Sequence, residues 1–149
     1  MSQGAINIPI VNQSANPLPH YATEGASGMD IRASLEAPVT LQPLERTLIP
    51  TGLFVEIPEG HEIQVRPRSG LAIKQGITCL NSPGTVDADY RGELKVILIN
   101  LSGEPQTVHN GDRIAQMVLQ KVEKINWLPA ETINETQRGA GGFGHTGKQ

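Results

Sequence analysis

The chain has 149 residues, of which 38% are hydrophobic and 18% charged, and its net charge is −3. This length suits one domain with a real core, because domains cluster near ~100–150 residues. The acidic balance argues against a surface that binds nucleic acid through phosphate attraction. A single cysteine, Cys79, excludes an intrachain disulfide and a zinc site built from several thiolates. No signal peptide or membrane span is visible, so a cytoplasmic protein with no membrane partner is expected.

Short apolar segments separated by proline and glycine run through most of the chain. The alternation of Ile6, Ile8 and Ile10 predicts the first strand. In chain order, strands are predicted at residues 5–11, 28–33, 38–41, 46–49, 52–57, 61–65, 77–80, 86–90, 93–100 and 113–122, with one helical turn at 69–75. Strands that follow strands, without long helices between them, predict an all-β sandwich or barrel and disfavour a parallel α/β fold.

The last twelve residues, 138–149, contain five glycines and one large apolar residue, Phe143. This composition predicts a disordered tail, because so little apolar surface cannot order a segment. The same residues also suit a flap that closes over a nucleotide. Glycine amides and the Arg138 guanidinium bind anions, and the Phe143 ring offers a stacking face.

Four further segments carry polar groups, and each also has an ordinary structural explanation. Residues 66–72 suit either an anion site at the start of a short helix or a serine N-cap beside an exposed arginine. Residues 81–93 hold two acids and a tyrosine, which suit a general base for water or a charged hairpin tip. Arg113 and Gln116 suit the solvent face of an edge strand. Asp30 and Arg32 share a strand face, where they would form a surface ion pair of little value.

Taken together and in order, five segments resemble the motifs of the trimeric deoxyuridine triphosphatases (dUTPases). These segments are residues 26–33, 67–72, 84–93, 111–116 and 138–147, so the resemblance covers nearly the whole chain. It implies a distorted jelly-roll β-barrel or sandwich over residues 1–137, with one short helix, and a mobile glycine-rich tail at 138–149 that closes over the active site. It also implies a homotrimer whose sites are shared between subunits, and Mg²⁺ as the cofactor.

The resemblance implies hydrolysis of dUTP to dUMP and pyrophosphate, which keeps uracil out of DNA and supplies dUMP for thymidylate synthesis. Asp87 would be the general base for the water that attacks the α-phosphorus, and the Tyr90 ring would pack on the deoxyribose. Asn81 would help to read uracil, and Phe143 would stack over it. Phosphate contacts are implied for Arg68, Ser69, Gly70, Gln116 and Arg138, and further substrate contacts for Val86, Gly142 and Gly144. Asp30 would support the site from behind these contacts, near a metal that no side chain is expected to ligate.

Two positions depart from the family pattern. The first motif reads Ala26-Ser27-Gly28-Met29 where nothing is usually inserted, and His145 stands where the tail usually has serine. The second departure leaves the tail's contacts with the γ-phosphate open.

The nearest alternative is a dCTP deaminase, or a bifunctional deaminase and dUTPase, of the same fold. Deamination commonly uses a glutamate in the hairpin region, whereas Asp87 and the intact fifth motif favour triphosphate hydrolysis. A non-catalytic nucleotide sensor is the second alternative, and the joint presence of Asp87 and Tyr90 argues against it.

Overall fold

The computed structural model describes residues 4–144 and 146–148, and within them it contains eleven strands and one helix. The strands are β1 (Ile10–Asn12), β2 (Met29–Arg32), β3 (Val39–Leu41), β4 (Arg46–Pro50), β5 (Leu53–Val55), β6 (His61–Arg66), β7 (Ile77–Cys79), β8 (Gly84–Val86), β9 (Lys95–Asn100), β10 (Gln106–Val108) and β11 (Arg113–Lys121), and the helix is α1 (Ser69–Gln75). The predicted all-β class is therefore confirmed. None of the described residues form a helix with the length and hydropathy that a bilayer span requires.

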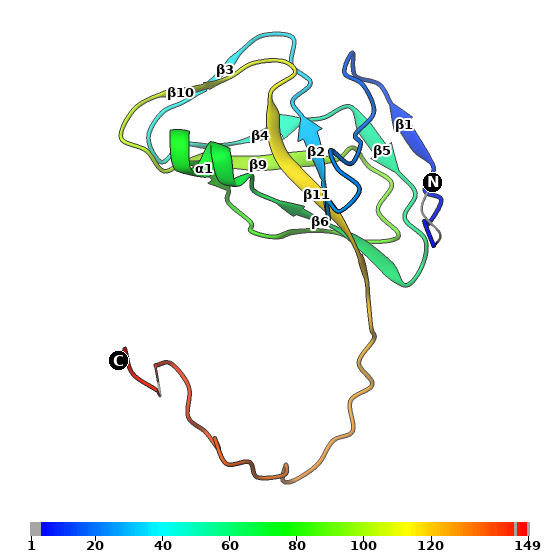
Figure 1. The fold of residues 1–149 in the computed structure, drawn as a ribbon, viewed down its shortest axis with the longest axis vertical. Helices are drawn as coiled ribbons and strands as arrows, with labels where there is room; N and C mark the ends of the chain where they lie inside the picture. Colours follow the sequence, from blue (N-terminus) through cyan, green and yellow to red (C-terminus); the bar gives the residue numbers. More distant parts are fainter. Residues whose placement is uncertain (1–3, 145, 149) are drawn as a thin grey trace.

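The strands form one four-stranded sheet, one three-stranded sheet and two strand pairs. The larger sheet has the order β2-β11-β6-β8, the smaller one β4-β9-β7, and β1 pairs with β5 while β3 pairs with β10. Every pairing is antiparallel. Figure 1 shows these sheets gathered into one body, from which the chain after β11 runs away as a long extended segment.

The core between the sheets is aliphatic, as the scarcity of aromatic residues predicts. Alternate residues of the strands point inward, for example Ile63 and Val65 in β6 and Val96 and Leu98 in β9. Burying one such side chain contributes roughly 1.5–3 kcal/mol. Two polar side chains are buried among the described residues, Thr51 and Asn100, and both are hydrogen-bonded to backbone carbonyls.

Most predicted elements are present, the majority with shorter bounds, whereas β4 and β6 each extend one residue further than predicted. The helix at 69–75 is confirmed, and Gly76 ends it in the left-handed conformation with φ 66°. Asn110 and Gly111 form the turn before β11, where Gly111 has φ 86°. The first strand is shorter than 5–11 because only residues 10–12 face β5, although Ile8 still packs against the core.

Two predictions about strands were wrong. The strand expected at 86–90 lies earlier, at β8, and the chain turns immediately afterwards, where the Tyr90 amide donates to the Asp87 carbonyl at 3.1 Å. The apolar spacing of Val86, Ala88 and Tyr90 resembled strand alternation, but this turn breaks the extended backbone. Strand β10 was not predicted, because three residues carry too little alternation to be seen without their partner β3.

Candidate active site

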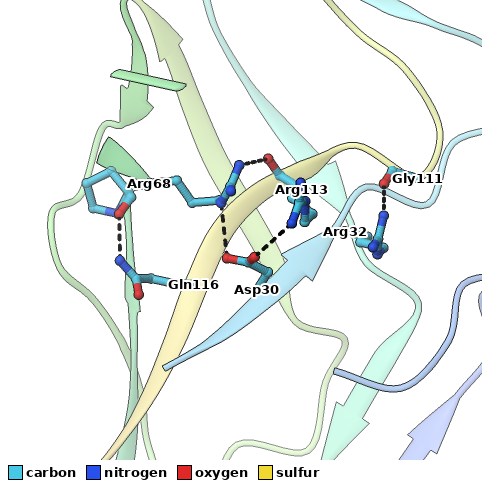
Figure 2. Close-up of polar contacts among 7 residues, drawn as sticks. Asp30, Arg32, Arg68, Gly111, Arg113 and Gln116 are labelled. Atoms are coloured by element: carbon cyan, nitrogen blue, oxygen red, sulfur yellow. Dashed lines mark hydrogen bonds and ion pairs between the residues drawn. The ribbon is translucent and has the colours of Figure 1, made fainter. Parts of the chain in front are cut away.

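A carboxylate and two arginines meet where β2, β11 and the end of β6 come together (Figure 2). Arg68 Nε lies 3.0 Å from Asp30 Oδ1, and Arg113 Nη1 lies 3.7 Å from Asp30 Oδ2. A guanidinium nitrogen of Arg68 also donates to the Arg113 carbonyl oxygen at 3.2 Å. We call Asp30, Arg68 and Arg113 the Asp30 cluster.

The ion pair expected between Asp30 and Arg32 is not formed. Arg32 instead donates to the carbonyl oxygen of Gly111 at 2.8 Å. The register of β2 against β11 shifts between Arg113 and Ala115, and at this irregularity Arg113 comes beside Asp30. Arg113 is exposed, as the solvent-face interpretation expects, but β11 is an internal strand and not an edge strand. Strand alternation gives no signal for the shift that brings Arg113 to Asp30.

Gln116 lies beside the Asp30 cluster, with its side-chain amide between Pro67 and Gly28. Gln116 is the register partner of Asp30 on β11, and its amide nitrogen donates to the Pro67 carbonyl oxygen at 3.1 Å. On the other side lies Gly28, where an added Cβ would come within 2.9 Å of Gln116 Oε1. The structure thus brings together three residues that the sequence analysis assigned to one site, Asp30, Arg68 and Gln116.

Helix α1 begins directly at this cluster. Its N-cap is Arg68, whose backbone is extended (φ −98°, ψ 130°) and whose side chain caps nothing. The serine N-cap that the sequence allowed is therefore wrong, because Ser69 is already the first helical residue. The first intrahelical bond in this turn runs from the Ala72 amide to the Arg68 carbonyl at 3.0 Å. The preceding amides, including those of Ser69 and Gly70, have no partner within the helix and can donate hydrogen bonds to an anion.

The second group of predicted site residues lies on the segment that leads from β7 through β8 into the following turn. Asn81 packs against Gly84, where a Cβ would come within 3.0 Å of Asn81 Nδ2. Val86 is half-buried and pairs with Ile63 of β6. Asp87 is exposed, and among the described residues its carboxylate takes part in no hydrogen bond or ion pair. It is free to accept a proton from water.

The two groups lie apart within one chain. Asp30 lines a cavity of about 190 Å³, Asp87 lines another of about 570 Å³, and the two cavities share no lining residue. Within the part of the chain that the structure describes, no hydrogen bond or ion pair joins Asp87 or Tyr90 to the Asp30 cluster. Asp30 and Asp87 therefore lie on separate surfaces of one chain.

The tail residues also lie away from both groups. Residues 123–140 are exposed, and Figure 1 shows this segment leading away from the sheets. Arg138 Nε donates to the Gly141 carbonyl oxygen at 2.5 Å, and Phe143 is fully exposed. The structure thus does not bring Arg138, Gly142, Phe143 or Gly144 to the Asp30 cluster. His145, whose contacts the sequence left open, lies outside the described residues.

Two kinds of reactive group, a side-chain metal cluster and the single thiol, can be judged from the described residues. Across residues 4–144 and 146–148, no three histidine, cysteine, aspartate or glutamate side chains group together as metal ligands. Burial raises the pKa of the Cys79 thiol to about 11, so it is protonated near neutral pH and is not a nucleophile.

The fold and these residues define a small antiparallel β protein in which two arginines flank one carboxylate beside the start of a short helix, and an exposed aspartate lies on a separate turn. A family model described as dUTPase matches residues 14–147. The deoxyuridine 5'-triphosphate nucleotidohydrolase of Finegoldia magna is 59% identical over 142 residues, which cover 95% of this chain and 99% of that protein. The chain belongs to the dUTPase family.

Solved structures support the same fold. The Staphylococcus bacteriophage 80alpha dUTPase with dUPNHPP superposes with a TM-score of 0.86 at 23% identity, covering 96% of this chain and 99% of that one. A variant of the dUTPase from phage phi11 of Staphylococcus aureus, described with a structural Mg(II) ion, gives a TM-score of 0.76 at 23% identity over 85% of this chain and 98% of that one. The predicted jelly-roll class is therefore confirmed.

Proposed function

We propose that this chain hydrolyses dUTP to dUMP and pyrophosphate, which keeps uracil out of DNA and supplies dUMP for thymidylate synthesis. The observation that carries the proposal is the dUTPase family match over residues 14–147, with a relative of that activity at 59% identity. The same match does not favour the dCTP deaminase alternative. A cytoplasmic location is part of the proposal, in keeping with the single buried thiol.

In this proposal Asp87 removes a proton from the attacking water. The oxygen of that water forms a bond to the α-phosphorus, the bond from the α-phosphorus to its bridging oxygen breaks, and pyrophosphate leaves. The carboxylate of Asp87 supports this role, since it is exposed to water and has no partner among the described residues. A positioned general base typically raises the rate ~10²–10⁴-fold.

Phosphate binding is assigned to the start of α1. The free amides of Ser69 and Gly70, the Arg68 guanidinium and the second N–H of the Gln116 amide would contact the phosphates. Donors fixed before the substrate arrives stabilise the charge that develops in the transition state. The Asp30 cluster supports this assignment, because it fixes where the Arg68 side chain lies.

Selection of the base and the sugar is assigned to residues 81–90, the segment that contains β8. Asn81 and the backbone at Val86 would read the edge of uracil, where cytosine would leave buried donors facing donors and be rejected strongly. The Tyr90 ring would pack on the deoxyribose and leave no room for a 2′-hydroxyl.

The active enzyme is proposed to be a homotrimer whose sites combine groups from different subunits. The separate cavities lined by Arg68 and by Asp87 support this, because neither alone holds both the proposed base and the proposed phosphate-binding arginine. We further propose that residues 1–137 form the domain and that the tail at 138–149 closes over the site. Arg138 would then clamp the γ-phosphate and Phe143 would stack over uracil, with Gly142 and Gly144 beside the substrate.

Magnesium is proposed to reach this site as an ion carried by the nucleotide. Mg²⁺ commonly binds through substrate phosphates, waters and one or two carboxylates rather than through an all-protein cage. When bound, the ion neutralises charge on the triphosphate.

A pyrophosphate-release assay with Mg²⁺ tests the proposal across dUTP, dCTP, dTTP and UTP. We expect release from dUTP alone. Ammonia release from dCTP would instead establish the deaminase alternative. A folded protein that acts on none of the four nucleotides would indicate the non-catalytic sensor.

A further inference from the structure

The ring of Tyr90 lies directly over Gly92. A Cβ added at Gly92 would come within 2.5 Å of the Tyr90 hydroxyl oxygen, 2.6 Å of Cζ and 3.0 Å of Cε1. Carbon atoms in contact normally lie about 3.5–4.0 Å apart. Any side chain at this position would therefore displace the ring by about 1 Å.

The backbone at Gly92 gives no other reason for glycine. Gly92 is not among the glycines with positive φ, so an L-residue could adopt its conformation. By contrast, Gly52, Gly76 and Gly111 all adopt positive φ, where glycine is favoured on conformational grounds. What Gly92 provides is space for the phenol ring.

The ring is also tied at its far end. The Tyr90 hydroxyl donates to the Glu93 carbonyl oxygen at 2.8 Å. The Glu93 carboxylate in turn accepts a hydrogen bond from the Gly52 amide at 3.0 Å, which links this residue to the turn between β4 and β5. The hydroxyl thus holds the ring against Glu93, which is itself bonded to the turn between β4 and β5. Gly92 lies between Tyr90 and Glu93 in the chain.

We propose that Gly92 is a positioning residue that determines specificity. Because Gly92 lacks a Cβ, the Tyr90 ring can lie flat against the backbone at Gly92, and in this position the ring blocks a ribonucleotide. The inference rests on the proposed function, in which Tyr90 excludes the 2′-hydroxyl. With alanine at position 92 the ring would be pushed off its hydrogen bond to Glu93 and would leave room for that hydroxyl.

The test compares kcat/KM for dUTP and UTP in three single variants and one double variant. Gly92→Ala is expected to lower the ratio of kcat/KM for dUTP to that for UTP by about tenfold or more, because a displaced Tyr90 ring would no longer exclude the 2′-hydroxyl. Its matched control is Gly103→Ala, where an added Cβ meets nothing within 4 Å, and this variant should keep the ratio of the parent. Tyr90→Ala is the reference for complete loss of the ring.

The double variant, Gly92→Ala with Tyr90→Ala, separates positioning from general damage. If Gly92 acts only by making room for the ring, alanine there should have no further effect once the ring is gone, so the two changes will be strongly non-additive. Should Gly92→Ala fold poorly by itself, the double variant is expected to recover the thermal stability of Tyr90→Ala. Additive losses, or no recovery of stability, would overturn the inference.

The outcomes also separate this inference from the function beneath it. If Tyr90→Ala keeps the parent ratio, the gate assigned to Tyr90 is wrong. If Tyr90→Ala lowers the ratio and Gly92→Ala does not, the gate stands and the role of Gly92 is refuted.

A second readout needs no activity. The chain has two tyrosines, so fluorotyrosine labelling gives two ¹⁹F resonances that a Tyr21→Phe variant assigns. We expect Gly92→Ala to shift the Tyr90 resonance and Gly103→Ala to leave it in place. An unchanged Tyr90 resonance in Gly92→Ala would refute the displacement of the ring.

Discussion

The Asp30 cluster gives the most quantitative prediction, because one substitution removes two ion pairs at once. Asp30→Ala deletes the contacts to Arg68 at 3.0 Å and to Arg113 at 3.7 Å. The side chains involved are 27%, 34% and 53% exposed for Arg68, Asp30 and Arg113. Pairs this accessible to water contribute about 0.2–1 kcal/mol each, with the shorter pair at the upper end.

We therefore expect Asp30→Ala to lower the free energy of unfolding by about 1–1.5 kcal/mol, which corresponds to roughly 3–5 °C in Tm for a chain of this size. The effect on activity should be larger than this modest loss suggests. Without the carboxylate, Arg68 keeps only its bond to the Arg113 carbonyl, and the two guanidinium groups repel each other. A phosphate-binding arginine that is free to move should cost about tenfold in kcat/KM for dUTP.

Thermal unfolding and steady-state kinetics measure the two effects separately. Asp30→Asn is the matched variant, since its amide oxygen can still accept from Arg68 Nε, and it should retain more activity than Asp30→Ala. A variant Asp30→Ala with the parent's kcat/KM would show that the cluster stabilises the fold only. An unchanged Tm would show that the ion pairs contribute nothing.

Three further outcomes are expected. Asp87→Asn should lower kcat by ~10²-fold or more with an unchanged Tm, because the carboxylate is exposed and unpaired; a kcat within a few-fold of the parent would remove Asp87 as the base. A chain that ends at residue 137 should keep its Tm, since residues 123–140 are exposed, but should lose most activity, and a large drop in Tm would refute the reading of the tail as a lid. Burial raises the pKa of Cys79 from 9.0 to about 11, so iodoacetamide at pH 9 should label the native thiol far more slowly than the unfolded one. The free energy of unfolding should also fall as pH rises from about 9 to about 11, because only the unfolded state loses the proton in that range. Equal labelling rates would refute this prediction.

Local patterns in the sequence predicted those parts of the fold that depend on neighbouring residues. Helix α1 was predicted with its observed bounds because a short segment that starts after Pro67 and stops at Gly76 needs no distant partner. Strand β10 was not predicted because it exists only through its pairing with β3, which lies more than sixty residues earlier.

The same distinction holds for the site. Motif order placed Asp30, Arg68 and Gln116 in one site, and the structure brings them together. The second arginine beside Asp30 could not be predicted, because a register shift on β11 brings Arg113 to Asp30 in place of the expected Arg32. The space that Gly28 and Gly92 leave for Gln116 and Tyr90 is equally hidden from the sequence, since a missing side chain leaves no pattern.

Helix α1 is the least secured element of the site. None of its seven residues is buried, Leu71 being only half-buried against the core, and no side chain caps its start. Isolated helices this short are marginal in water, so α1 can open locally while β11, the second strand of the four-stranded sheet, stays closed. In hydrogen–deuterium exchange, the amides of α1 should exchange early and those of β11 late. A ligand held by the first turn would slow exchange along the whole helix, so the arrival of a triphosphate could be followed through backbone amides that never touch it.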